Sequence, residues 1–398
     1  MFDENAPELE QMNSVSEQMW ADYSNGTPDA EQALQKAGSV FLLDVFPQTE
    51  EGYYLLATPH DLKVFSAMVN SGLSTINAKL TANIDMTGET NFLPIGFNTE
   101  TENSSDTEAN KVTFKGVFDG QTHRISNLVI EREKSVGVGL FGTLMTPAEI
   151  KNLVLDATCR IKGYDRVGLI GRSTGTGNIK LERLGNEGTV EAVYQAPAGI
   201  LGNANAGSLA LIANCYSTGS IKAGNGKNAA QICGWMGSVG ARVSNCWSTA
   251  DIEGYDSQDR LFCRYGGNTM LVNCYSNNGD GSQANKQTAE EFASGMVTWM
   301  LNGQSAEAPV WYQRLGTDPH PTLYPESGVV VKKDGGYANE GADAVESVAA
   351  KVGALVSVYD VQGRLVRPAQ AAERALQGLP KGMYILRGTA ASRKVMVK

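Results

Sequence analysis

Five aspartates in the middle of the chain have the clearest capacity for acid–base chemistry: Asp119, Asp156, Asp165, Asp251 and Asp256. A glycoside hydrolase needs two carboxyl groups beside the scissile bond, about 5–5.5 Å apart in a retaining enzyme. These acids do not recur at equivalent positions of the repeats described below. Asp119 stands in a Phe-Asp-Gly-Gln turn, where an acid ordinarily stabilises the turn itself. We therefore predict no catalytic residue and a protein that is not an enzyme, with a polysaccharide hydrolase or lyase as the alternative.

Three further motifs match known sites only in outline. Residues 137–142 fit Gly-x-Gly-x-x-Gly, but a dinucleotide site needs a helix directly after the glycines. Residues 171–175 fit Gly-x-Ser-x-Gly, yet none of the three histidines stands in a triad pattern. Residues 277–281 lack the spacing of a calcium-binding EF-hand, and no Cys-x-x-Cys occurs. The sequence thus predicts neither a cofactor nor a metal.

The phrase Asn-Cys-aromatic-Ser occurs three times and places three cysteines and three aromatic residues at equivalent positions. Its cysteines are Cys215, Cys246 and Cys274, and its aromatic residues are Tyr216, Trp247 and Tyr275. If the cysteines face inward as an apolar ladder, the alternation of a strand turns the aromatic residues outward. Stacked, exposed rings could bind sugar rings or a partner surface, so we predict these three residues as the binding site. Two alternatives stay open: a disulfide between neighbouring cysteines, and a segment that covers the rings.

Internal repeats determine the fold that must position these residues. The Asn-Cys phrase and its weaker copies, aligned on the second residue, fall at 128, 153, 184, 215, 246 and 274. A Gly-Leu-x-Gly phrase follows in step at 139–142, 168–171, 199–202 and, degraded, 231–234. The spacing of 25 to 31 residues is too short for a propeller blade, and the apolar residues alternate in twos rather than at helical spacing. Each repeat therefore predicts one coil of a parallel β-helix, which we expect to be right-handed.

The open ends of such a solenoid would aggregate unless they were covered. Residues 58–72 predict a helix with Thr58 as N-cap, Pro59 at its first position and Leu62, Phe65 and Val69 on one face. Residues 288–303 predict a second helix, with a capping box at its start and Phe292, Met296, Trp299 and Met300 at helical spacing. We expect these two helices to cap the two ends of one unit over residues 51–330.

The entry to this unit resembles the GLUG-motif proteins, which are bacterial surface proteins described as adhesin-like β-helices. The matching stretches are Leu62–Gly72, Ala78–Met86, Leu93–Gly96, Phe118–Gln121 and the Gly-Leu-x-Gly phrases at 139–142 and 168–171. The resemblance covers about residues 51–330. It implies a non-enzymatic, adhesin-like protein that contacts a carbohydrate or a surface protein.

Residues 331–345 are polar and rich in glycine, which predicts a linker. Short β-type segments over residues 346–398 predict a small immunoglobulin-like β-sandwich. The stretches Val358–Val366, Gly382–Leu386 and Lys394–Lys398 resemble the C-terminal sorting domain of the type IX (Por) secretion system. That resemblance implies export from a Bacteroidetes-type cell to an extracellular or cell-surface location.

The composition narrows the class of partner. The 398 residues carry a formal net charge of −10, and residues 1–50 form an acidic N-terminal segment. An acidic front with a balanced middle gives no support to nucleic-acid binding. The sequence shows neither an apolar run of the roughly 20 residues that a transmembrane helix needs nor a secretory signal. It does not specify the ligand or the oligomeric state.

Overall fold

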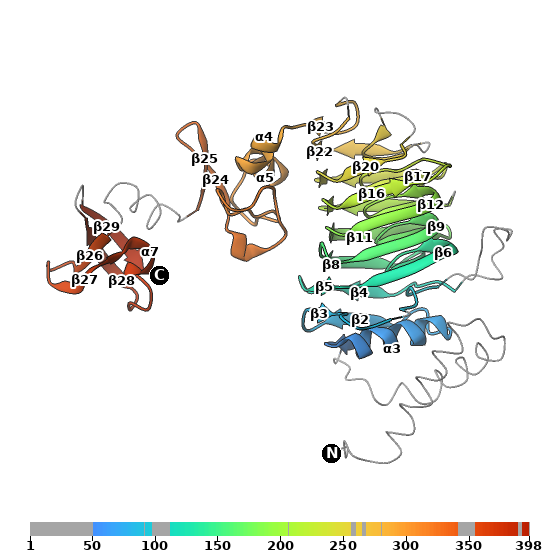
Figure 1. Cartoon of the computed structure of the whole chain (residues 1–398), viewed down its shortest axis with the longest axis horizontal. Helices are drawn as coiled ribbons and strands as arrows, with labels where there is room; N and C mark the ends of the chain where they lie inside the picture. Colours follow the sequence, from blue (N-terminus) through green and yellow to red (C-terminus); the bar gives the residue numbers. More distant parts are fainter. Residues whose placement is uncertain are drawn as a thin grey trace, which may run out of the picture. The chain divides into compact units, whose positions relative to one another are not determined.

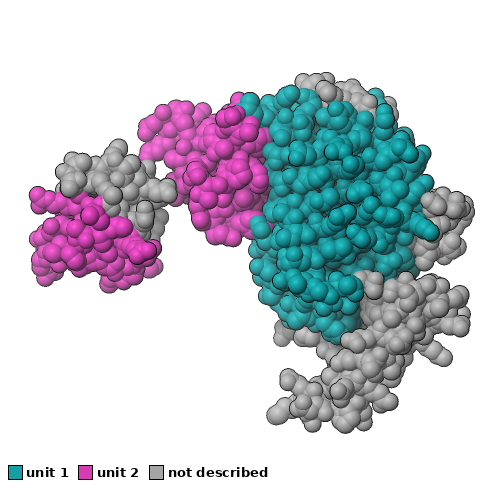
Figure 2. Space-filling model, in the orientation of Figure 1, with its two compact units in different colours: residues 1–288 teal, residues 289–398 magenta. Residues whose placement is uncertain are grey.

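A computed structural model describes residues 51–90, 92–97, 112–205, 207–255, 260–264, 268–279, 281–340, 355–388 and 392–397. The predicted acidic segment 1–50 lies outside these ranges. The chain divides into two compact units, Met1–Thr288 and Ala289–Lys398, which Figure 2 colours separately. The sequence assigns residues 289–330 to the solenoid, whereas the structure groups them with the C-terminal part. Among the described residues, no helix is both long and apolar enough to cross a membrane.

The first unit is a parallel β-solenoid of about five turns, which confirms the predicted all-β class and its coiled architecture (Figure 1). Its first sheet is built mainly from β1 (Tyr53–Leu56), β2 (Asn77–Leu80), β4 (Val117–Asp119), β8 (Glu149–Leu155), β11 (Gly177–Asn186), β15 (Tyr216–Ser217), β19 (Trp247–Ser248), β22 (Tyr275–Ser276) and β23 (Asn285–Lys286). The same sheet also contains β3 (Ile84–Asp85), β5 (Arg124–Ser126), β14 (Ser208–Ala213), β18 (Ala241–Ser244) and β21 (Met270–Val272).

Two further parallel sheets form the other faces of the coils. The second sheet comprises β7 (Phe141–Met145), β10 (Ile170–Thr174), β13 (Leu201–Ala204) and β17 (Cys233–Met236). The third comprises β6 (Val129–Val138), β9 (Arg160–Val167), β12 (Thr189–Pro197), β16 (Ser220–Ala223) and β20 (Asp251–Glu253). A chain that passes through all three sheets in each repeat buries one face of every strand against the other two. The right-handed sense of the coil stays a prediction.

The register of the strands confirms the repeat alignment read from the sequence at positions 153, 184, 215, 246 and 274. The alignment of position 128 is wrong, because Arg124 pairs with Val154 and Val129 pairs with Arg160. Tyr216 pairs with Trp247, and Trp247 pairs with Tyr275, so the Asn-Cys phrases stack directly on one another. In the second sheet Ile170 pairs with both Phe141 and Leu201, which places the Gly-Leu-x-Gly phrases in one column as well. The period of the sequence is therefore the length of one coil.

Asparagine explains the corner that precedes each aromatic residue. Four asparagines and one arginine at this repeat position have a left-handed backbone with φ between 52° and 55°: Asn152, Arg183, Asn214, Asn245 and Asn273. Asparagine tolerates this conformation better than other residues with a side chain. The position thus turns the chain within the first sheet without a glycine.

Helix α3 (Pro59–Asn70) lies at the N-terminal end of the stack (Figure 1). The hydroxyl of Thr58 accepts a hydrogen bond from the Asp61 amide, and the Asp61 carboxylate accepts one from the Thr58 amide. This reciprocal capping box fixes the start of the helix. Leu62, Phe65 and Val69 are buried and belong to the same apolar cluster as the coils.

The second unit begins with two short helices where the sequence predicts one. Helix α4 (Ala289–Ala293) and helix α5 (Met296–Leu301) are separated at Gly295, whose φ is 87°. This left-handed residue rotates the following turn, so α5 buries Val297 and Leu301 instead of the predicted Met296, Trp299 and Met300. The role of these helices as a cap stays a prediction.

The rest of the second unit contains a turn of 3-10 helix (η3, Pro325–Ser327) and a small antiparallel hairpin of β24 (Val330–Lys333) and β25 (Gly336–Asn339). This hairpin occupies part of the predicted linker 331–345, because Asp334 and Gly335 adopt positive φ values that suit a tight turn. Residues 341–354 of that linker lie outside the described residues.

The last segment folds as one antiparallel sheet with the strand order β27–β26–β28–β29. The strands are β26 (Leu355–Asp360), β27 (Leu365–Ala371), β28 (Gly382–Arg387) and β29 (Ser392–Val397), and helix α7 (Ala372–Ala375) follows β27. Their apolar cluster includes Val356, Val358, Tyr384, Leu386 and Val395. The β-strands occur where the sequence predicts them, whereas the second layer of an immunoglobulin-like sandwich is not confirmed.

Candidate functional site

The predicted aromatic column is buried, which corrects the expectation that it faces solvent. Tyr216 is 1% exposed, Trp247 0% and Tyr275 4%. Tyr216 stacks on Trp247 with ring centroids 5.0 Å apart and an interplanar angle of 10°. The Tyr216 ring also lies so close to Gly185 that a Cβ there would be 2.3 Å from a ring carbon. Large rings that cover one another in this way stabilise the solenoid, so they are not the binding surface.

The cysteines form the inward ladder that the sequence predicts. All six are buried and free, so the alternative of a disulfide is not realised: Cys159, Cys215, Cys233, Cys246, Cys263 and Cys274. Burial raises the pKa of the Cys159 thiol to about 12. A thiol with so high a pKa is protonated near neutral pH and is a poor nucleophile.

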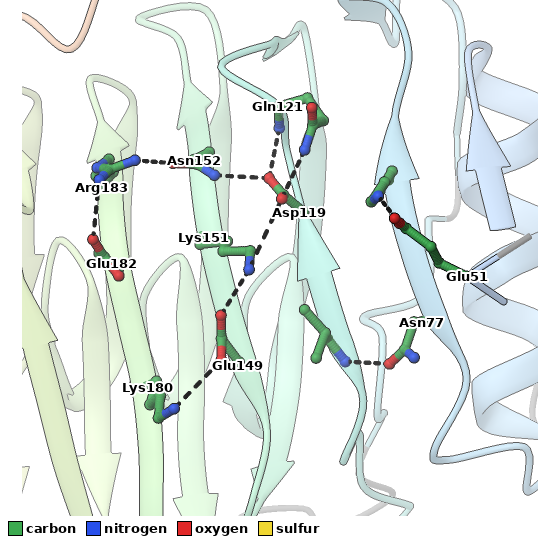
Figure 3. A network of polar contacts seen from close by, with 12 residues as sticks. Glu51, Asn77, Asp119, Gln121, Glu149, Lys151, Asn152, Lys180, Glu182 and Arg183 are labelled. Atoms are coloured by element: carbon green, nitrogen blue, oxygen red, sulfur yellow. Dashed lines mark hydrogen bonds and ion pairs between the residues drawn. The ribbon is translucent and has the colours of Figure 1, made fainter. Parts of the chain in front are cut away.

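The acids on the first sheet are engaged in structural contacts, as Figure 3 shows for Asp119. The Asp119 carboxylate accepts hydrogen bonds from the backbone and side chain of Gln121 and from the Asn152 amide, at 2.7–3.0 Å. Lys151 bridges Asp119 to Glu149, and Glu149 in turn faces Lys180 on the next coil. These contacts confirm that Asp119 stabilises its turn, and they pair its carboxylate with Lys151.

The other predicted acids have different surroundings. Asp156 holds a turn by accepting a hydrogen bond from the Thr158 amide at 2.9 Å. Asp251 is exposed on β20, and Asp256 lies outside the described residues. Asp251 also lines an open pocket together with Glu253. Asp165 differs from these acids because it is only 7% exposed and lines a smaller cavity.

The remaining motifs are structural. The glycines of 137–142 lead from β6 into β7, so no helix follows them. Ser173 in the Gly-x-Ser-x-Gly match is buried in β10, where its hydroxyl contacts that of Ser208 at 3.0 Å. Asp280 lies outside the described residues, and the described residues contain no cluster of three or more potential metal ligands.

A cavity of about 240 Å³ opens where the third sheet turns into the second. It is lined by Asp165, Arg166, Gln195, Ala196, Asn203, Asn228 and Trp235. Arg166, Ala196 and Asn228 have left-handed backbones with φ of 59°, 57° and 65°. These residues occupy the corner itself, so successive coils contribute equivalent positions to the same cavity.

Hydrogen bonds fix most of the polar side chains that line the cavity. The side-chain amide of Gln195 donates to Asp165 Oδ2 at 3.4 Å, and Arg166 Nε lies 3.6 Å from the same oxygen. Asn228 Nδ2 donates to Gln195 Oε1 at 3.2 Å, and Asn203 Nδ2 donates to the Trp235 carbonyl at 2.8 Å. The corner is thus stiffened across three coils.

Two oxygen atoms in this lining accept no hydrogen bond from any described residue. They are Asp165 Oδ1 and Asn203 Oδ1, and Asn203 is only 4% exposed. Burial raises the pKa of Asp165 above its ordinary value of 3.8, against the opposing effect of the positive charge on Arg166. Unpaired buried acceptors destabilise a fold, and these two oxygens are closed off from solvent.

One exposed aromatic ring lines the cavity. Trp235 is 46% exposed, and the guanidinium of Arg264 lies 5.1 Å from its ring centroid. Tyr164 and Tyr194, the residues directly before Asp165 and Gln195, stack with centroids 5.6 Å apart, and Tyr194 is 40% exposed. An apolar ring beside buried polar groups is a suitable surface for a ligand with one flat apolar face and hydroxyl groups at its edge.

The sequence contains a signal for this site that the repeat analysis does not use. Thr143, Arg172, Asn203 and Trp235 each follow the final glycine of a Gly-Leu-x-Gly phrase, and the strands place them in register. Three of the four are buried, and Trp235 is exposed at the end of that column. The first three members of this column are polar and buried, and the last is an exposed tryptophan. This change of residue type distinguishes Trp235 from the other three.

Replacing Asp165 by Asn is expected to stabilise the protein near neutral pH. The raised pKa means that ionisation of Asp165 favours the unfolded chain. The favourable contribution of the protonated acid is complete below the unfolded pKa of about 3.9. It is lost as the pH rises through the higher folded pKa. Arg166 and Arg172 oppose this shift through their charge.

Thermal melts of wild type and Asp165→Asn between pH 3 and pH 8 measure this effect. The variant should melt at a higher temperature near pH 7, and the difference should shrink as the pH falls below about 4, where both side chains are neutral. A variant that is less stable than wild type at pH 7 would contradict the assignment of Asp165 as a destabilised acid.

Comparisons with known proteins give limited similarity. No family model matches the chain. It is 35% identical over 146 residues to Halomucin of Haloquadratum walsbyi, a match that covers 36% of this chain and 2% of Halomucin. The chain thus corresponds to a small fraction of that relative's length. Among solved structures, it is similar to a Bacteroides ovatus protein described as "a putative immunoglobulin A1 protease", with 14% identity and a TM-score of 0.43 over 69% of this chain and 93% of that one.

Proposed function

We propose that this chain is a secreted or cell-surface binding protein of the adhesin-like type, without enzymatic activity, that contacts a glycan through the cavity at Trp235. The observation that supports this most is the half-exposed Trp235, which lines a small cavity together with polar side chains that include Asp165 and Gln195. Sugars present an apolar ring face and hydroxyl donors, which such a surface complements. The partial identity with Halomucin is compatible with a surface location.

A polysaccharide hydrolase or lyase on the same scaffold is the second candidate. A hydrolase would need a second carboxyl group about 5–9.5 Å from the first, depending on its stereochemistry. Among the described residues that line the cavity, Asp165 is the one carboxylate. The raised pKa of Asp165 suits a general acid, so digestion of polysaccharide must be assayed together with binding.

Replacing Trp235 by Ala is expected to weaken glycan binding by about 30-fold or more, because a central tryptophan commonly contributes 2 kcal/mol or more to a binding interface. Binding should be measured on a glycan array and then by titration with a glycan that the array identifies. Met270→Ala is the matched control, since Met270 is an exposed apolar residue on β21 and does not line this cavity.

The two candidate functions give different results in this experiment. Wild-type protein that binds glycan and leaves polysaccharides intact supports the adhesin-like function. Release of new reducing ends, abolished in Asp165→Asn, would support the enzyme. Equal binding by wild type and Trp235→Ala would remove this cavity as the site.

The C-terminal segment 346–398 gives a route to the surface. We propose, from its resemblance to type IX sorting domains, that it directs export or attachment and that its sheet is one layer of an immunoglobulin-like sandwich. The antiparallel sheet of β26 to β29 is compatible with that arrangement.

A further inference from the structure

The negative charge at the cavity is shielded from a ligand. Asp165 carries the one carboxylate among the described residues that line the cavity, and its side chain is only 9% exposed. Its Oδ1 atom is closed off from solvent. Its Oδ2 atom accepts a hydrogen bond from Gln195 and lies 3.6 Å from Arg166 Nε. A molecule in the cavity therefore meets little of this carboxylate.

Two guanidinium groups at the same corner keep exposed surface. Arg166 lines the cavity, and its side chain is 25% exposed. Arg264 is half-buried and donates through Nε to Asn228 Oδ1. Its guanidinium also lies over the Trp235 ring, and both Asn228 and Trp235 line the cavity. Positive charge is thus present both in the lining and beside the exposed tryptophan.

Lys227 adds a third cation, which no described acid neutralises. It is exposed, directly precedes Asn228 and pairs across the coils with Gln195. In the part of the chain that the structure describes, Lys227 forms no ion pair. Lys222 on the same coil differs, because its ammonium lies 3.1 Å from the Glu253 carboxylate. The accessible charge of the corner is therefore positive.

This positive charge is local, because the chain as a whole has a formal net charge of −10. Attraction between exposed charges is screened beyond about 8 Å at physiological salt, so a ligand at the corner responds mainly to the cations beside it. Guanidinium groups bind carboxylate and sulfate oxygens well. The exposed part of Trp235 adds an apolar surface for a sugar ring.

We infer that this corner selects an acidic glycan: the ring of one sugar residue lies against Trp235, and its carboxylate or sulfate group lies in the positive field of Arg166, Lys227 and Arg264. This inference rests on the proposed glycan-binding function and specifies its ligand class. Both acidic groups present the same anionic oxygens to the cations, and the test separates them.

The test compares acidic saccharides with neutral counterparts that keep the same ring. The probes are trigalacturonate with its methyl ester, sialyllactose with lactose, and a sulfated galactose trisaccharide with its unsulfated form. Wild-type protein should bind at least one acidic probe about tenfold or more tightly than its counterpart at low salt. This preference should narrow at about 0.5 M salt, which screens the attraction between exposed charges. The probe with the largest preference identifies the acidic group.

Lys227→Glu tests the charge of the corner directly. The residue is exposed and without an ion pair to a described residue, so the variant should fold, which thermal melting checks. Affinity for the preferred acidic probe should fall about tenfold or more, whereas that for the neutral counterpart should stay within about twofold. Lys227→Gln should give a smaller loss in the same direction.

Lys332→Glu is the matched control, since Lys332 is an exposed lysine on β24 in the second unit. The same change of charge there should leave both affinities unchanged. Equal binding of every acidic probe and its neutral counterpart would overturn the inferred ligand class and leave glycan binding intact. A Lys227→Glu variant that binds like the Lys332→Glu control would do the same. No binding to any saccharide would overturn the proposed function and this inference together.

Discussion

Replacing Trp247 by Ala is expected to lower the free energy of unfolding by about 3–5 kcal/mol, the usual cost of truncating a buried tryptophan. Trp247 is fully buried and stacks on Tyr216 in the neighbouring coil. It also pairs in register with Tyr275 on the other side. Removal of the indole opens a cavity between two coils, because the ring fills the space against Tyr216. Guanidinium denaturation followed by circular dichroism measures the loss.

Trp235→Ala is the matched control for this stability measurement, because the same substitution is made at a residue that is 46% exposed. We expect it to reduce stability by less than about 1 kcal/mol, as is usual for surface positions. The two tryptophans should thus have opposite roles: Trp247 affects folding and Trp235 affects binding. A small effect of Trp247→Ala on the free energy of unfolding would show that the aromatic column does not stabilise the fold. The column would then again be a candidate binding surface.

Gly219→Ala is expected to destabilise the solenoid by about 3 kcal/mol, at the upper end of the range for overpacked cores. A Cβ at this position would lie 1.8 Å from the carbonyl oxygen of Gly188 in the preceding coil. The obstacle is backbone, so no side-chain rotation can relieve the clash, and two coils must separate. The fall in the midpoint of guanidinium denaturation measures this cost.

Gly336→Ala is the corresponding control, since the nearest atom to a Cβ there is the Lys333 carbonyl oxygen at 3.8 Å. We expect a change within about 0.5 kcal/mol, as at most surface positions. If Gly219→Ala changed the stability as little as Gly336→Ala, the close approach of the coil backbones at Gly219 would be wrong.

Much of the solenoid could be predicted because the repeats encode it locally. The period of the Asn-Cys phrase gives the length of a coil, and strand alternation places Cys215, Cys246 and Cys274 in the core. The reason for the repeated glycines could not be predicted as well from the sequence. Sequence alone suggests glycine for corner conformations, but at the ends of the Gly-Leu-x-Gly phrases glycine is required by close approach. A Cβ on Gly202 would lie 2.6 Å from the Gly171 carbonyl oxygen, and one on Gly234 would lie 2.2 Å from that of Gly202.

From residue 153 onward the sequence by itself determined which residues are equivalent, and the tertiary structure decided which of them are accessible. Tyr216, Trp247 and Tyr275 lie outside the apolar cluster that contains the cysteines, yet they are buried. Exposure depends on what covers a strand, and period-two patterns carry no information about that. The cavity around Asp165, Asn203 and Trp235 likewise arises only when residues from separate coils meet at one corner. Their spacing of about one repeat makes them neighbours in space, but only the packed side chains show that two of their oxygens are left without a partner.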